Sequence, residues 1–197
     1  MALSCSYYVV ISSICALFWK PDVPCNLVSP WLHPILNDVP RKDGIVDKVR
    51  RLPYLRACLN KSLRITPPFS YNLPRRMPPE CAIILGSFVT GNTTVFMSSY
   101  VAHHDVEIFR DPESFVPDRW LDEGARELQP YFVPFSTDAR GCIGRKISYM
   151  KQTVMLATLV HRYELALPYP KWDQRRVEVT NLLPGPMPLK VWRRNLL

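Results

Sequence analysis

The stretch Phe135-Ser-Thr-Asp-Ala-Arg140-Gly-Cys142-Ile-Gly144 lies directly before the strongest helical pattern in the chain. Apolar residues recur there at helical spacing and predict a helix of about 18 residues that begins near Cys142 and ends before Pro168. Its predicted buried face is Ile143, Ile147, Met150, Val154, Ala157 and Val160. A cysteine at a helix start meets the positive end of the helix dipole, and nearby Arg140 adds a cation. Both favour a thiolate, a ligand for soft or borderline metals, whereas the alternative is a small buried cysteine.

The residues upstream of this stretch predict a second helix and two short strands. Pro53 suits a helix start, and apolar residues at spacing four predict a helix over residues 53–65. Its apolar face is Leu55, Leu59 and Leu63, with Cys58 beside them. Residues 81–85 and 93–97 are typical of short strands. These elements predict a fold that is mainly α with small β-sheets.

The N-terminal part differs in composition from the rest. Residues 1–19 carry no charged side chain and predict a membrane-anchor helix, because about 20 apolar residues span a bilayer. The alternatives are a buried helix of a soluble protein or a stretch that never folds. Residues 20–43 hold five prolines and predict a Pro-rich linker or an unrelated segment. Residues 44–197 are therefore expected to form the folded domain.

The charges and cysteines exclude several classes of function. A net charge of +8 favours an acidic partner or an anionic lipid surface, but the chain has no block of five basic residues, so we expect no nucleic-acid partner. The six cysteines include no C-x-x-C pair, which argues against a local zinc site. Cysteines this sparse also argue against a disulfide framework, and they favour a reduced, cytosol-facing setting.

Three pieces of the sequence carry a resemblance to a known family. The first is the pattern F-x-x-x-x-R-x-C-x-G at residues 135–144, the second is Phe115-Val-Pro-Asp-Arg-Trp120, and the third is residues 54–64 followed by Pro67. In this order and spacing they resemble the C-terminal haem-binding part of the cytochromes P450, the haem-thiolate monooxygenases, and look most like members from filamentous fungi. The resemblance covers about residues 44–168. It implies an incomplete C-terminal portion of the cytochrome P450 fold, with residues 44–197 as a partial haem-binding domain.

The resemblance implies a haem b cofactor and a role for five residues around it. Cys142 matches the axial ligand of the haem iron, a thiolate that pushes electron density toward the metal and favours O–O cleavage. Arg140 matches the residue that pairs with a haem propionate, and His103 is a second propionate candidate. Phe135 matches the aromatic residue beside the thiolate. Gly144 would let the backbone pass close to the porphyrin.

Two further matches belong to the structural core. Four positions depart from the family, and two of these, Lys61 and Asp138, bear on the core and the site; the other two are His104 and Lys151. Arg64 and Arg119 match arginines that, together with a glutamate, lock the core behind the haem. Lys61 stands in place of that glutamate, three residues before Arg64, so repulsion replaces attraction. Either three cations converge in a buried site, at a typical cost of about 3–5 kcal/mol, or Lys61 turns to solvent and the arginines find other acceptors. Asp138 stands where the family has glycine and adds a negative charge.

The resemblance implies oxidation of a small organic substrate with O2 and electrons from an acidic flavoprotein reductase, in fungal secondary metabolism. It also implies a membrane-associated protein that faces the cytosol at the endoplasmic reticulum. Three basic residues suit the contact with the reductase: Arg145, Lys146 and Lys151. The Ala/Gly-Gly-x-Asp/Glu-Thr motif of the oxygen-activating helix is absent upstream of residues 53–65, so no catalytic residue is identified.

That missing motif and these departures favour an alternative function. The chain would then be a truncated, degenerate and non-catalytic relic, and we predict no independent turnover. A second alternative is a small basic membrane-associated protein.

Overall fold

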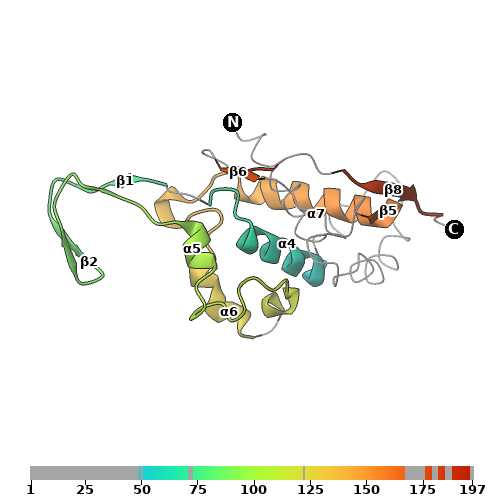
Figure 1. Cartoon of the computed structure of the whole chain (residues 1–197), viewed down its shortest axis with the longest axis horizontal. Helices are drawn as coiled ribbons and strands as arrows, with labels where there is room; N and C mark the ends of the chain where they lie inside the picture. Colours follow the sequence, from blue (N-terminus) through green and yellow to red (C-terminus); the bar gives the residue numbers. More distant parts are fainter. Residues whose placement is uncertain are drawn as a thin grey trace.

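Two long helices that lie side by side form the body of the protein (Figure 1). They are α4 (Pro53–Ile65) and α7 (Arg145–Arg162). The computed structural model describes residues 49, 51–70, 73–121, 123–166, 176–178, 182–184 and 188–195, without the side chains of 176–178 and 182–184. The helix predicted over residues 53–65 is confirmed, and so is the 18-residue helix after the cysteine. The predicted anchor (1–19) and linker (20–43) lie outside the described residues.

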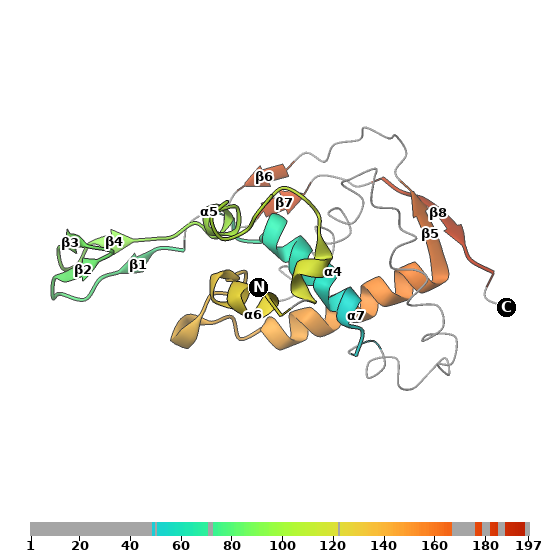
Figure 2. The same cartoon turned by 90° about the horizontal axis from the view of Figure 1, so that it is seen from below.

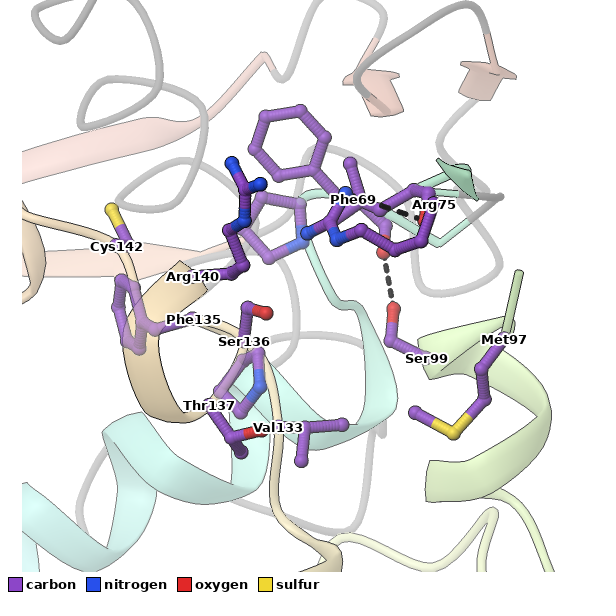
Figure 3. Close-up of a pocket in the computed structure, with 13 residues that line it drawn as sticks. Phe69, Arg75, Met97, Ser99, Val133, Phe135, Ser136, Thr137, Arg140 and Cys142 are labelled. Carbon is purple, nitrogen blue, oxygen red and sulfur yellow. Dashed lines mark hydrogen bonds between the residues drawn. The ribbon is translucent and has the colours of Figure 1, made fainter. Parts of the chain in front are cut away.

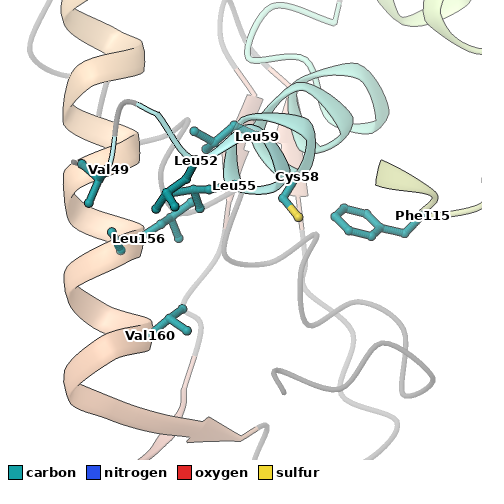
Figure 4. Packing of buried hydrophobic residues seen from close by; sticks show 9 residues of the cluster. Val49, Leu52, Leu55, Cys58, Leu59, Phe115, Leu156 and Val160 are labelled. Atoms are coloured by element: carbon teal, nitrogen blue, oxygen red, sulfur yellow. The ribbon is translucent and has the colours of Figure 1, made fainter. Parts of the chain in front are cut away.

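The main hydrophobic core fills the space between α4 and α7 (Figure 4). Pro53 occupies the first turn of α4, where its missing N–H costs nothing. The predicted face of α4 is buried throughout, with Leu59 and Leu63 at 0% exposure. It meets Leu156, Ala157 and Val160 of α7, and Phe115 closes one side. This packing fixes the second half of α7 against α4.

The buried face of α7 differs from the predicted one over its first half. Ile143 is 100% exposed and Ile147 is 54% exposed, so the predicted apolar stripe points away from α4 there. The buried residues of α7 are Ser148, Tyr149, Gln152, Thr153, Leu156, Ala157 and Val160. Polar residues are accepted on this face because Gln152 donates to the Ser148 hydroxyl (2.8 Å) and Thr153 donates to the Tyr149 carbonyl (2.7 Å). The second half of the predicted face is confirmed, since Ala157 and Val160 are buried and the half-buried Val154 packs against the same core.

A two-part β arm projects from the helical body (Figures 1 and 2). Strand β1 (Arg75–Arg76) pairs with β4 (Thr94–Val95), and β2 (Ala82–Ile84) pairs with β3 (Ser87–Val89), both antiparallel. The predicted strands at 81–85 and 93–97 contain β2 and β4, but each pairs with a strand that the pattern did not predict. Gly91 is required near the bend, since a Cβ there would lie 1.8 Å from the Pro79 carbonyl oxygen.

Short elements connect these parts and follow α7. The short helices are α5 (Ser99–His103), η2 (Pro117–Trp120), α6 (Ala125–Leu128), η3 (Gln129–Tyr131) and η4 (Asp138–Arg140). The later strands are β5 (Tyr163–Ala166), β6 (Arg176–Glu178), β7 (Leu182–Pro184) and β8 (Lys190–Arg193). They form two more antiparallel pairs, β5 with β8 and β6 with β7. The described part of the chain is thus mainly α with small two-stranded sheets, as predicted.

Within the ranges given above, none of the helices is both long and apolar enough to cross a bilayer.

Candidate functional site

A pocket lies where the segment before α7 faces the base of the β arm (Figure 3). We call residues 133–144 the cysteine loop, because Cys142 and most of the pocket wall belong to it. The residues that line the pocket are Pro68, Phe69, Leu73, Arg75, Met97, Ser99, Val133, Pro134, Phe135, Ser136, Thr137, Arg140 and Cys142. The structure therefore brings together three of the predicted site residues, Phe135, Arg140 and Cys142.

Backbone hydrogen bonds hold the cysteine loop in a tight turn. The N–H of Cys142 donates to the Phe135 carbonyl at 2.8 Å, and the N–H of Gly141 donates to the Asp138 carbonyl at 3.0 Å. The carbonyl of Cys142 in turn accepts from the N–H of Arg145 at 3.2 Å, at the first residue of α7. The Cys142 side chain is exposed and forms no disulfide. Its sulfur is thus presented at the pocket on a backbone with little freedom to move.

Asp138 adopts the backbone conformation that favours glycine. Its φ angle is +51°, in the left-handed region, which typically costs a residue with a Cβ about 1–2 kcal/mol. Ser136, two residues earlier, has φ of +58°. The glycine that the family pattern places at position 138 thus has a physical reason in this loop. Aspartate tolerates the left-handed conformation better than most residues, which explains how the loop keeps this backbone turn without a glycine at position 138.

Two guanidinium groups reach the pocket, one of which the sequence analysis missed. Arg140 was predicted, and Figure 3 shows its guanidinium on the same side of the loop as the Cys142 thiol. Arg75 comes from β1 on the opposite wall, where it also donates to the Pro74 carbonyl at 3.1 Å. No local motif marks Arg75, because its role depends on the pairing of β1 with β4.

These side chains fit a haem group. A thiol can ligate the iron, two guanidiniums can pair with two propionates, and apolar walls such as Phe69, Met97 and Phe135 suit the porphyrin faces. Phe135 is fixed from behind, since its ring lies 5.1 Å from the Tyr149 ring. Gly144 lies outside the lining. A Cβ there would meet the Cys142 sulfur at 3.7 Å, an ordinary contact.

The two core arginines find acceptors other than a glutamate. Lys61 and Arg64 are both 0% exposed, so the alternative in which Lys61 turns to solvent is wrong. Arg64 donates to the carbonyls of His103 and Pro112, and Arg119 donates to the Asp111 carbonyl. Burial, reinforced by the charge of Arg119, lowers the pKa of Arg64 to about 10. Arg64 and Arg119 therefore lie close together, and peptide carbonyls accept hydrogen bonds from both arginines.

The structure does not bring His103 to the pocket lining. Its ring is 0% exposed and stacks on Phe132, with centroids 5.6 Å apart. Its Nε2 accepts a hydrogen bond from the N–H of Val133 at 3.0 Å. Burial first, and the charge of Arg64 second, lower the pKa of His103 to about 3. His103 is thus a neutral hydrogen-bond acceptor behind the pocket wall.

Comparisons with known proteins show the family of the chain. A sequence model described as cytochrome P450 matches residues 36–191, well over half of the chain. Cytochrome P450 monooxygenase 1 of Neocamarosporium betae is 34% identical over 168 residues, which are 84% of this chain and 34% of that protein. Fusicoccadiene C-8 hydroxylase of Phomopsis amygdali is 29% identical over 177 residues, which are 81% of this chain and 34% of that protein.

The similarity extends to solved structures. The crystal structure of a cytochrome P450, CYP102L1, superposes with a TM-score of 0.82 at 26% identity, and covers 96% of this chain and 42% of that one. The haem domain of cytochrome P450DA gives a TM-score of 0.81 at 20% identity. The chain thus spans about a third of the length of the two fungal relatives and has the fold of one part of the solved proteins.

Proposed function

This chain belongs to the cytochrome P450 family, and from that premise we propose that it forms the thiolate side of the haem site of a fungal haem-thiolate monooxygenase. The reaction would oxidise a small organic substrate with O2 and electrons from a reductase. A bound haem would supply the activation of O2. The observation that carries the proposal is the placement of one thiol and two guanidiniums, Cys142, Arg140 and Arg75, around one pocket with apolar walls.

Each of these side chains would have a separate task. Cys142 would ligate the iron from a rigid loop, with the free N–H groups at the start of α7 helping to hold a thiolate. Arg140 and Arg75 would bind the propionates from opposite walls and fix how the porphyrin lies. Phe135 would cover the sulfur and exclude water. The chain would therefore bind and orient the cofactor.

We also propose that electrons arrive at the face of the molecule beside the start of α7. Arg145 and Lys146 are exposed and Lys151 is half-buried, so this end of the helix offers positive charge next to the cysteine loop. An acidic flavoprotein reductase is the partner of matching charge. Membrane attachment through residues 1–19 and a position at the endoplasmic reticulum, facing the cytosol, complete the proposal.

The decisive experiment is haem reconstitution of the purified chain. We expect the reduced, carbon monoxide-treated protein to show the strongly red-shifted Soret band of a thiolate-ligated haem. Cys142→Ala should abolish this band. Cys81→Ala is the matched control, because Cys81 is also an exposed free thiol but lies outside the pocket.

The outcomes separate the two main functions. A red-shifted band that needs Cys142 supports the haem-binding role, and turnover is then assayed with a reductase. A folded chain that retains no haem would leave the non-catalytic relic as the better description.

A further inference from the structure

We propose that His103 is a positioning residue for the cysteine loop, and that it links the buried Arg64 to the pocket wall. This inference rests on the proposed function only in treating the pocket as the haem site. It assigns His103 a different task from pairing with a propionate.

The side chain of His103 holds the first residue of the cysteine loop. Its Nε2 accepts from the N–H of Val133 at 3.0 Å, and Val133 lines the pocket. Two rings fix the imidazole, since Phe132 stacks on it and Phe109 meets it edge-on with centroids 6.4 Å apart. The acceptor atom is therefore held in one place, and so is the N–H that it binds.

The backbone of His103 connects the same residue to the core. Its carbonyl accepts from the guanidinium of Arg64, which is buried in α4. His103 is also the last residue of α5, and the other end of α5 is tied down by side-chain donors. Ser98 donates to the Ser70 carbonyl at 2.7 Å, and Ser99 donates to the Phe69 carbonyl. A shift of Arg64 would thus be passed through His103 to Val133.

The protonation state suits this task. An imidazole can accept at Nε2 only while that nitrogen carries no proton, so the acceptor role needs the neutral form with its proton on Nδ1. The pKa of His103 is lowered to about 3 by burial and by Arg64, and the ring stays neutral near neutral pH. The contact to Val133 is therefore present under ordinary conditions.

The test compares His103→Gln with His103→Met in the full chain. The two side chains have nearly the same length, and the glutamine amide oxygen can replace Nε2 as an acceptor, whereas methionine sulfur accepts only weakly. The first readout is amide hydrogen exchange at Val133, which requires no haem. We expect exchange about tenfold faster in His103→Met, because a part-buried N–H loses its partner. In His103→Gln we expect exchange close to that of the unchanged protein.

The second readout is spectroscopic. After reconstitution, the fraction of haem with the red-shifted carbon monoxide band should fall in His103→Met and be kept in His103→Gln. If neither the unchanged protein nor either variant binds haem, the proposed function is refuted. Amide hydrogen exchange at Val133 would still decide the role of His103.

Each outcome of the comparison decides the proposal. Equal exchange at Val133 in the unchanged protein and in His103→Met would overturn it. A methionine variant that fails to fold beside a native-like glutamine variant would support it, because only the acceptor differs. Failure of both variants would overturn it, since the ring itself would then be what the fold needs.

Discussion

Replacing Lys61 by glutamate tests whether the carboxylate of the family pattern would stabilise the core around Arg64. Lys61 and Arg64 lie three residues apart on α4 and are both fully buried. The pKa of Arg64 is lowered from its ordinary value to about 10, and at about 1.4 kcal/mol per unit this opposes folding by about 3 kcal/mol. Because the folded pKa of Arg64 is lower than the unfolded one, the penalty is complete at neutral pH, and it fades only as the pH rises from about 10 toward the ordinary pKa of arginine.

Burial and the charge of Arg119 cause that penalty, and a carboxylate at position 61 would offset part of it by attracting Arg64 at i, i+3 spacing. Burial is the largest cause of the lowered pKa of Arg64, and a buried glutamate must itself leave water. We therefore expect Lys61→Glu to raise the free energy of unfolding by about 1–2 kcal/mol. The midpoint of thermal unfolding should rise by about 2–4 °C per kcal/mol in a chain of this size.

Urea unfolding of three variants measures the effect. Lys61→Met removes the charge without adding a carboxylate and should fall between the unchanged protein and Lys61→Glu. Lys146→Glu reverses an exposed lysine and should change stability by less than about 0.5 kcal/mol. If Lys61→Glu is no more stable than Lys61→Met, attraction to Arg64 contributes nothing and the reasoning is refuted.

Three further predictions follow from the geometry of the loop, the helix and the histidine. Asp138→Gly should stabilise the cysteine loop and slow haem loss, because glycine adopts a positive φ without strain. Asp138→Ala should be less stable than Asp138→Gly by about 1 kcal/mol. Unfolding measures the stability, and haem transfer to an acceptor protein measures the rate of haem loss. Leu156→Ala should lower the free energy of unfolding in urea by about 2–5 kcal/mol, while Ile143→Ala should change it by less than about 0.5 kcal/mol. Similar losses in the two variants would show that Ile143 belongs to the buried face of α7, as its periodicity predicts. The folded pKa of His103 lies below its ordinary value, so unfolding binds a proton as the pH falls below about 6.5. Between about pH 8 and about pH 5 the unchanged protein should lose about 2 kcal/mol more than His103→Gln, and parallel pH curves would contradict this.

Helix α4 could be predicted from the sequence because one apolar face and one proline determine it. Its leucines repeat at spacing four and Pro53 marks its start, so local pattern and tertiary packing agree. Helix α7 had an equally clear pattern, but its first half turns Ile147 outward and buries Gln152 instead. Periodicity alone cannot show that side chains such as Gln152 make hydrogen bonds within the helix on the packed face.

The site could be predicted where it is local in sequence and not where pairing assembles it. Phe135, Arg140 and Cys142 lie within one loop, and the structure places all three at the pocket. Arg75 enters only because β1 pairs with β4, and a two-residue strand leaves almost no pattern. His103 was found by its place in the chain, but its contact to the loop depends on a fold that brings residues 103 and 133 together.

The substitution at position 61 acts far from the pocket, yet the contacts give it a route there. Lys61 places a buried cation three residues from Arg64, and the guanidinium of Arg64 binds the carbonyl of His103. His103 in turn binds the N–H of Val133 in the pocket wall. A core in which Arg64 lacks a carboxylate partner at position 61 would therefore loosen the loop that presents Cys142 before it unfolds the two-helix body, because the body rests on leucine packing that Lys61 leaves intact. Haem affinity should thus respond to Lys61→Glu more strongly than global stability does. A variant with higher stability and unchanged haem affinity would show that the core and the pocket are independent.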